Sequence, residues 1–137
     1  MLKLIIGVKG TGKTKILIDM VNKATEASDG AVICIEKGSK LRSEVKFRTR
    51  LVNTEDYAIN SAEALYGFIA GMLAGNHDVT DIFVDATMRI CNRDVAACNV
   101  MFAKLNALSE KCETNIVMTF SAPVEEVSDD IKKLIIN

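Results

Sequence analysis

Three glycines, a lysine and a threonine near the start of the chain have the spacing of a loop that binds phosphate. Residues 7–14 read Gly-Val-Lys-Gly-Thr-Gly-Lys-Thr and fit the pattern G-x-x-x-x-G-K-[ST] at every fixed position. Glycines allow successive backbone N–H groups to turn toward one anion. In such a loop Lys13 would place its ammonium on the β- and γ-phosphates, and the Thr14 hydroxyl would hold Mg²⁺. The alternative is a glycine-rich turn that leaves the lysine in solvent.

The residues on either side of this loop have the patterns that its chemistry requires. Residues 1–6 are mostly apolar and predict a short buried strand that runs into Gly7. From Thr14 onward, the spacing of apolar residues predicts a helix, whose N-terminus would add partial positive charge at the anion. The predicted nucleotide-binding residues are Gly7, Val8, Lys9, Gly10, Thr11, Gly12, Lys13, Thr14 and Lys15.

A second informative stretch is the run Asp81-Ile82-Phe83-Val84-Asp85, an apolar strand that ends in a carboxylate. An Asp at the end of such a strand can hold Mg²⁺ through water and complete the oxygen shell of the ion. Many strands end in Asp, so the pattern gains its meaning from the phosphate loop upstream. Thr14 and Asp85 are therefore the predicted metal-binding residues.

The remaining segments predict a parallel sheet with helices packed on it. Residues 31–35 form an apolar strand that ends at Glu36, and residues 115–121 form another, which carries Thr119 and Ser121 toward the triphosphate. Those two hydroxyls either sense the γ-phosphate or only end the strand. Helices are expected after a cap at Asn60 or Ser61 and after Asp94. The fold class expected is α/β, a three-layer α/β/α sandwich with a mostly parallel central sheet, as one nucleotide-binding domain over residues 1–137.

The segment 37–50 carries six basic residues. Val45, Phe47, Thr49 and Leu51 alternate with Lys46, Arg48 and Arg50, which predicts a half-buried strand over residues 45–51 with a basic outer face. A solvated sheet edge protected by charge is one interpretation. A contact surface for nucleic acid or for an acidic partner is the other, although no interleaved aromatic residues favour nucleic acid.

Composition narrows the class of protein. The net charge of −1 argues against a general nucleic-acid or membrane binder, and no apolar run has the length of a membrane span. The four cysteines have no metal-binding spacing, and each falls in an apolar pattern that predicts a core position. With no signal peptide in view, a cytoplasmic protein with reduced thiols is expected.

These motifs together resemble the P-loop NTPase superfamily, and within it the additional-strand branch typified by recombinase-like ATPases. The resemblance covers the order of elements along most of the chain and is specific at residues 7–14. In recombinase-like ATPases, a glutamate at the end of the strand after the P-loop helix activates the attacking water, and Glu36 matches that placement. Other members carry the glutamate directly after the magnesium Asp, where this chain has Ala86. The first half is also similar to the thymidine-kinase group, but the cysteine pairs for its zinc are missing.

The resemblance implies an ATP-binding, Mg²⁺-dependent NTPase that hydrolyses ATP slowly, with Lys13 and Glu36 as catalytic residues. Many such ATPases receive an arginine from a neighbouring subunit, and Arg89 or Arg93 is the candidate here, which implies an oligomer or a protein partner. No guanine-reading motif occurs, so ATP is expected in place of GTP. One alternative is a nucleotide-binding switch that does not turn over, and another is a nucleoside or small-molecule kinase.

Overall fold

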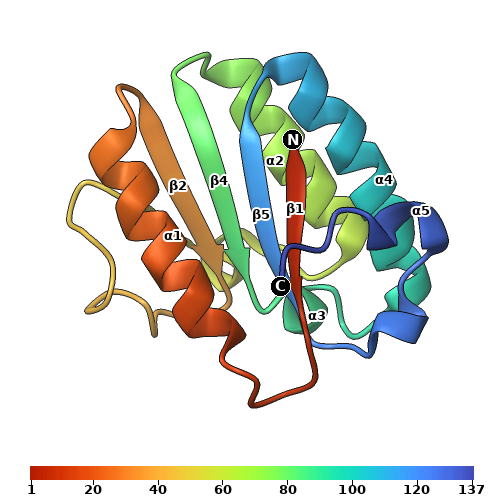
Figure 1. Cartoon of the computed structure of the whole chain (residues 1–137). Helices are drawn as coiled ribbons and strands as arrows, with labels where there is room; N and C mark the ends of the chain where they lie inside the picture. Colours follow the sequence, from red (N-terminus) through yellow and green to blue (C-terminus); the bar gives the residue numbers. More distant parts are fainter.

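The strands of the protein form a single sheet in which every neighbouring pair runs parallel. The computed structural model describes residues 1–137, and the order of strands across its sheet is β1-β5-β4-β2-β3. The strands are β1 (Leu2–Ile6), β2 (Ala31–Glu36), β3 (Arg50–Asn53), β4 (Val79–Asp85) and β5 (Asn115–Phe120). The labelled arrows of β1, β2, β4 and β5 point the same way in Figure 1, and β3 pairs in parallel with β2, so the carboxyl ends of the strands meet at one edge of the sheet.

Helices cover both faces of this sheet, which confirms the α/β class with three layers. The helix α1 (Lys13–Ala27) lies on one face, and α2 (Ala62–Gly75) and α4 (Val95–Cys112) lie together on the other (Figure 1). Four short helical segments complete the structure: η1 (Thr54–Tyr57), α3 (Thr87–Ile90), η2 (Val124–Glu126) and α5 (Asp129–Lys132). Because α3 directly follows β4, it lies at the carboxyl edge of the sheet.

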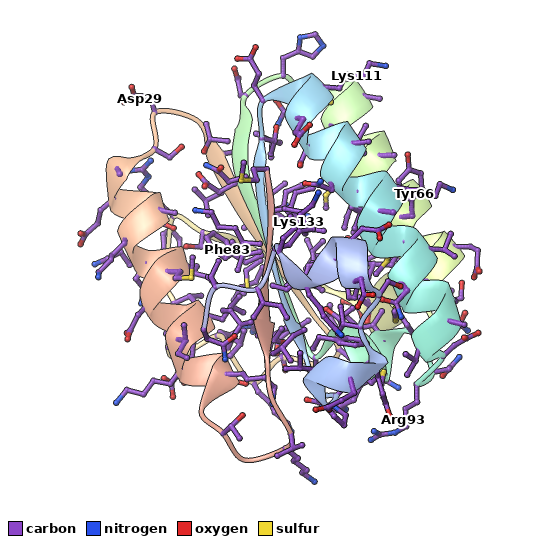
Figure 2. The ribbon with its side chains drawn as sticks, turned by 45° about the vertical axis from the view of Figure 1, so that its right-hand side comes forward. Asp29, Tyr66, Phe83, Arg93, Lys111 and Lys133 are labelled. Carbon is purple, nitrogen blue, oxygen red and sulfur yellow. The ribbon has the colours of Figure 1, made fainter.

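The core has two parts because strand side chains alternate between the two faces. On β1, Leu4 and Ile6 join the larger cluster under α2 and α4, whereas Ile5 joins the smaller one under α1. Phe83 of β4 belongs to the smaller cluster and lies between α1 and the sheet (Figure 2). The strands are therefore buried on both sides, which explains why their sequences are nearly continuous apolar runs.

Two of the long helices begin at the residues that the sequence predicted. Ser61 Oγ accepts a hydrogen bond from the backbone N–H of Ala64 at 3.0 Å, and Asp94 Oδ1 accepts one from Ala97 at the same distance. Each side chain satisfies a backbone N–H that has no partner within the first helical turn. The caps set where α2 and α4 begin, and the start of α4 sets the length of the loop after α3.

The last residues of the chain lie along the outer edge of β1. The backbone N–H of Leu4 donates to the carbonyl of Leu134, and Ile136 donates back to the carbonyl of Leu4, both at 2.9 Å. The Asn137 side chain accepts from the backbone N–H of Ile6 at 2.9 Å and donates to its carbonyl. This segment hydrogen-bonds to part of an edge that otherwise presents unpaired backbone groups. No helix of the structure combines the length and the apolar character that crossing a bilayer requires.

The predicted strand over residues 45–51 is wrong for residues 45–49 and correct for residues 50 and 51, which begin β3. Only residues 50–53 pair with β2, while the segment before them makes turns and Phe47 is fully exposed. The reason is a set of contacts with α1 that replace strand pairing. Asn22 accepts from the backbone N–H of Lys46 at 2.9 Å and donates to the carbonyl of Glu44 at 3.0 Å.

The cysteine prediction is correct in three positions and wrong in one. Cys34, Cys91 and Cys98 are buried, and burial raises the pKa of the Cys34 thiol to about 12. Cys112 is exposed because it is the last residue of α4 and lies on the outer side of the helix end. Its neighbours in the sequence, Lys111 and Glu113, are charged, so the apolar pattern assumed for this cysteine does not extend to the end of the helix.

Candidate functional site

The loop between β1 and α1 has the backbone conformation that its glycines allow. Gly10 and Gly12 have φ angles of 87° and 81°, in the left-handed region that side chains disfavour. Gly12 is the N-cap of α1, and the carbonyl of Gly12 accepts the first helical hydrogen bond, from Ile16 at 3.3 Å. The loop therefore leads directly into the N-terminus of a 15-residue helix, where partial positive charge is concentrated.

Lys13, the first residue of α1, is held against the loop by its own ammonium group. Its Nζ donates to the carbonyl of Val8 at 2.9 Å and lies 3.5 Å from Thr11 Oγ1, while only 8% of the residue is exposed. Burial lowers the pKa of Lys13, and the negative charge of Asp85 partly opposes this shift. The ammonium is thus held by the loop, at a place where the charge of the Asp85 carboxylate still acts on it.

Thr14 and Asp85, the two predicted metal-binding residues, are brought together by the fold. The Thr14 hydroxyl donates to the Asp85 carboxylate, with oxygen–oxygen distances of 3.3 Å and 3.4 Å. Thr14 lies in the first turn of α1 and Asp85 is the last residue of β4, 71 positions later in the sequence. Hydroxyl and carboxylate oxygens are the donors that Mg²⁺ prefers. No group of three or more His, Cys, Asp or Glu side chains lies close enough to hold an ion, so Mg²⁺ here would need phosphate and water oxygens as well.

Thr119 of β5 orients the same carboxylate from the other side. Its hydroxyl donates to Asp85 Oδ1 at 2.8 Å and accepts from the backbone N–H of Ala86, also at 2.8 Å. Ala86 has a φ of 63°, so the chain turns sharply as it leaves β4. Thr119 therefore has a role that neither interpretation from the sequence included. Its hydroxyl positions Asp85 and the turn that follows it.

These residues surround a hollow of roughly 200 Å³ at the carboxyl edge of the sheet. Its lining consists of Lys9, Gly10, Gly12, Lys13, Thr14, Asp85, Ala86, Thr119 and Ser121. Gly7, Val8, Thr11 and Lys15 from the predicted binding set lie outside this lining, although Val8 and Thr11 contact Lys13. Only Ala86 among these lining residues is hydrophobic, and the hollow brings the ammonium groups of Lys9 and Lys13 and the carboxylate of Asp85 to one place.

Glu36 is placed beside this site but its carboxylate is used elsewhere. It is opposite Asp85 in the register of β2 and β4 and is only 5% exposed, so it is a buried residue at the end of its strand. Its two oxygens accept hydrogen bonds from the backbone N–H groups of Lys40, at 3.1 Å, and Leu41, at 3.2 Å. Burial raises the pKa of Glu36, and these two hydrogen bonds oppose the rise. The residue therefore holds the turn after β2 and does not line the hollow.

The structure has two further hollows that the sequence did not predict. One of roughly 340 Å³ includes His77, but it lies at the amino ends of β4 and β5, opposite the phosphate loop. The other lies next to the phosphate loop and is lined in part by Lys9, Lys40, Arg89 and Arg93. No sequence pattern joins these four cations, because they come from separate segments that only the sheet brings to one edge. Ligands of open parallel sheets bind at the carboxyl ends of the strands, so the candidate site is at that edge.

No protein-family model matches this chain, and no curated protein sequence matches it either. The assignment of the site therefore depends on the residues at the carboxyl edge of the sheet and on their geometry.

Proposed function

We propose that this protein binds ATP with Mg²⁺ at the phosphate loop and hydrolyses it slowly, as a P-loop NTPase of the additional-strand branch. The observation that carries the proposal is the convergence of Lys13, Thr14 and Asp85 on one polar hollow, with Thr14 and Asp85 within hydrogen-bond distance. The strand order supports it. β5 lies between the phosphate-loop strand β1 and the Asp-terminated strand β4, which is where that branch has its additional strand.

The residues have separable tasks in the proposed reaction, in which water attacks the γ-phosphorus in line with the departing ADP. Loop N–H groups and the Lys13 ammonium stabilise the charge on the phosphate oxygens. Thr14 and Asp85 would hold Mg²⁺, which would supply positive charge to neutralise the phosphate oxygens. Thr119 keeps the Asp85 carboxylate oriented. Glu36 is the candidate for orienting the water, and this role requires at least one of its oxygens to leave the turn that it now holds.

Calorimetric titration with Mg-ATP tests the proposal. Wild-type protein should bind, and Lys13→Ala should weaken binding about ten- to a hundredfold, because a hydrogen bond to a charged group contributes about 1.5–3 kcal/mol. Lys23→Ala is the matched control, since Lys23 is an exposed lysine farther along the same helix. Thr14→Ala, at an exposed position, should reduce the Mg²⁺ dependence of binding without affecting folding. No heat of binding in folded wild-type protein would refute the proposal.

A second candidate function is a nucleotide-dependent switch that does not turn over. Two observations favour it: Ala86 follows Asp85 where other members of the branch carry a glutamate, and both oxygens of Glu36 accept backbone hydrogen bonds. Steady phosphate release that falls sharply in Glu36→Gln supports the enzyme. Tight Mg-ATP binding with no release at any protein concentration supports the switch. ATP consumption only after a hydroxyl-bearing acceptor is added would instead indicate a kinase.

A further inference from the structure

A second hollow, of roughly 410 Å³, continues from the candidate nucleotide site along the carboxyl edge of the sheet. The two hollows share Lys9, Ala86 and Ser121 as lining residues, so they are neighbours. The second one extends toward α3 and the segment after β5, away from Lys13 and Thr14, neither of which lines it. A volume of this size is in the range of sites that hold small molecules.

Four cations from four different segments line this second hollow. Lys9 comes from the phosphate loop, Lys40 from the turn after β2, Arg89 from α3 and Arg93 from the loop before α4. Figure 2 shows Arg93 at the same end of the molecule as the loop between β1 and α1, and Lys111 at the opposite end. No Asp or Glu is among the lining residues. The charge is therefore of one sign throughout the hollow.

None of the four cations forms an ion pair within the protein, although the charge of Lys40 acts on the Glu36 carboxylate. The ion pairs of the molecule are Lys46 with Glu26 and Lys132 with Asp129, and both lie elsewhere. The chain as a whole has 17 basic and 18 acidic residues, so acidic groups are as available as basic ones. Four cations without ion pairs around one hollow repel one another, and a bound anion would offset this repulsion by its attraction to each of them.

The loop that carries Arg93 is held in an uncommon conformation. Asn92 and Arg93 have φ angles of 53° and 58°, which cost non-glycine residues free energy. The Asn92 side chain donates to the carbonyl of Asn60 at 2.6 Å, and the backbone N–H of Arg93 donates to the carbonyl of Met88 at 2.8 Å. These bonds fix the path of the backbone between α3 and α4, and with it the position from which Arg93 reaches the hollow.

We propose that the second hollow binds the phosphate group of a small phosphorylated molecule, beside the triphosphate of the bound nucleotide. Arginine forms paired hydrogen bonds with phosphate oxygens, and Arg89 and Arg93 are both available for this. Ser121 adds a hydroxyl donor, and Met88 and Pro123 supply apolar surface for the carbon part of the ligand. This inference deepens the proposed function, because it relies on that function only for the identity of the neighbouring ligand.

A titration with glycerol 3-phosphate, followed by ¹H–¹⁵N NMR of the full chain, tests this inference. Wild-type protein should show shifts in the amides of residues 86–93 and 121–122. The double variant Arg89→Gln/Arg93→Gln should bind at least about tenfold more weakly, because two charge-assisted contacts are lost. The matched control is Arg42→Gln/Arg48→Gln, which removes the same charge from two exposed arginines outside the hollow and should bind like wild type.

The variant Lys13→Ala separates this inference from the proposed function. In this variant, glycerol 3-phosphate should still shift the amides of residues 86–93, while Mg-ATP should bind more weakly than to wild-type protein. Shifts confined to residues 8–14 that disappear in Lys13→Ala would mean that phosphate enters only the first hollow, and would overturn the second site while leaving the nucleotide site intact. Equal binding by the two arginine double variants would also overturn it. If wild-type protein binds glycerol 3-phosphate but not Mg-ATP, the second site stands and the proposed function fails.

Discussion

Asp85 receives hydrogen bonds from hydroxyl groups on two different elements. Thr14 approaches from α1 at 3.3 Å and Thr119 approaches from β5 at 2.8 Å, and both donate to the same oxygen, Oδ1. Thr119 is only 2% exposed, so its bond is protected from competition with water, whereas Thr14 is exposed. The carboxylate is therefore oriented mainly by β5, and in the proposed function the Thr14 hydroxyl would exchange its contact with Asp85 for one with the metal ion.

The raised pKa of Glu36 gives the protein a specific pH dependence of stability. Burial disfavours the charged carboxylate, so the folded protein holds the Glu36 proton at a higher pH than the unfolded chain does. The folded state then binds more protons, and stability falls as pH rises through the folded pKa. Relative to Glu36→Gln, wild-type protein should gain stability as pH falls from 8 toward the unfolded value near 4.5.

Urea unfolding of wild type and Glu36→Gln at matched pH values measures this difference. Because Gln has only one acceptor oxygen for the two backbone N–H groups, a constant offset between the two proteins is expected at all pH values. Only the change of the offset with pH reports on the carboxyl group. A difference that is independent of pH, or that favours wild type more at high pH, would contradict the raised pKa.

At the scale of elements, α1 couples the phosphate loop to the sheet through a narrow apolar stripe. Leu17 and Val21 are fully buried against Val32, Phe83 and Val117, whereas Ile16 on the same helix is 38% exposed. The stripe fixes how α1 lies on the sheet, and therefore where Lys13 and Thr14 stand relative to Asp85. Packing far from the ligand thus sets the geometry of the site.

Leu17→Ala should reduce the free energy of unfolding by about 2–5 kcal/mol, because it removes a fully buried side chain and leaves a cavity. Ile16→Ala is the control, because Ile16 is the neighbouring residue and is partly exposed. It should reduce the free energy of unfolding by a smaller amount. Chemical denaturation of both variants gives the two values. Equal losses would mean that the described contact between α1 and the sheet does not carry this stability.

At the scale of the whole molecule, the parallel arrangement gives the protein two chemically different ends. The carboxyl ends of the strands carry the phosphate loop, Asp85 and the four cations, while the amino ends carry the hollow around His77. Figure 1 shows the loop between β1 and α1 at the end toward which the arrows point. Every residue of the proposed chemistry lies at that end.

Hydrogen exchange should show this difference between the two ends of the sheet when Mg-ATP binds. At a ligand concentration about 100 times the dissociation constant, the folded state gains about 2.7 kcal/mol, so amides that exchange only by global unfolding should slow about a hundredfold. Amides in residues 8–14 and 85–89 should also gain local protection. Amides near His77 that exchange by local opening should not change. Protection centred on the His77 end would place the ligand in the wrong hollow and contradict the proposed site.

The amino-acid sequence by itself determined the α/β class, the order of the main strands and helices, the glycine-rich loop between the first strand and its helix, the helix cap at Asp94, and a second cap at Asn60 or Ser61. These features are local, because a run of apolar residues, a glycine spacing or a capping side chain acts within a few positions. The same locality explains the wrong predictions at residues 45–49 and at Cys112. An alternating pattern indicates a strand only if a partner strand is available, and here the side chain of Asn22 on α1 binds that backbone instead.

Only the tertiary structure decided which distant residues share the site. The order β1-β5-β4-β2-β3 puts Thr119 next to Asp85 and brings Glu36 into register with it, and no spacing along the chain encodes these neighbours. The engagement of the Glu36 carboxylate with Lys40 and Leu41, and the gathering of four cations beside the phosphate loop, were likewise invisible in the sequence. In a parallel sheet, contacts of this kind depend on the order and register of strands, which result from packing the whole chain at once.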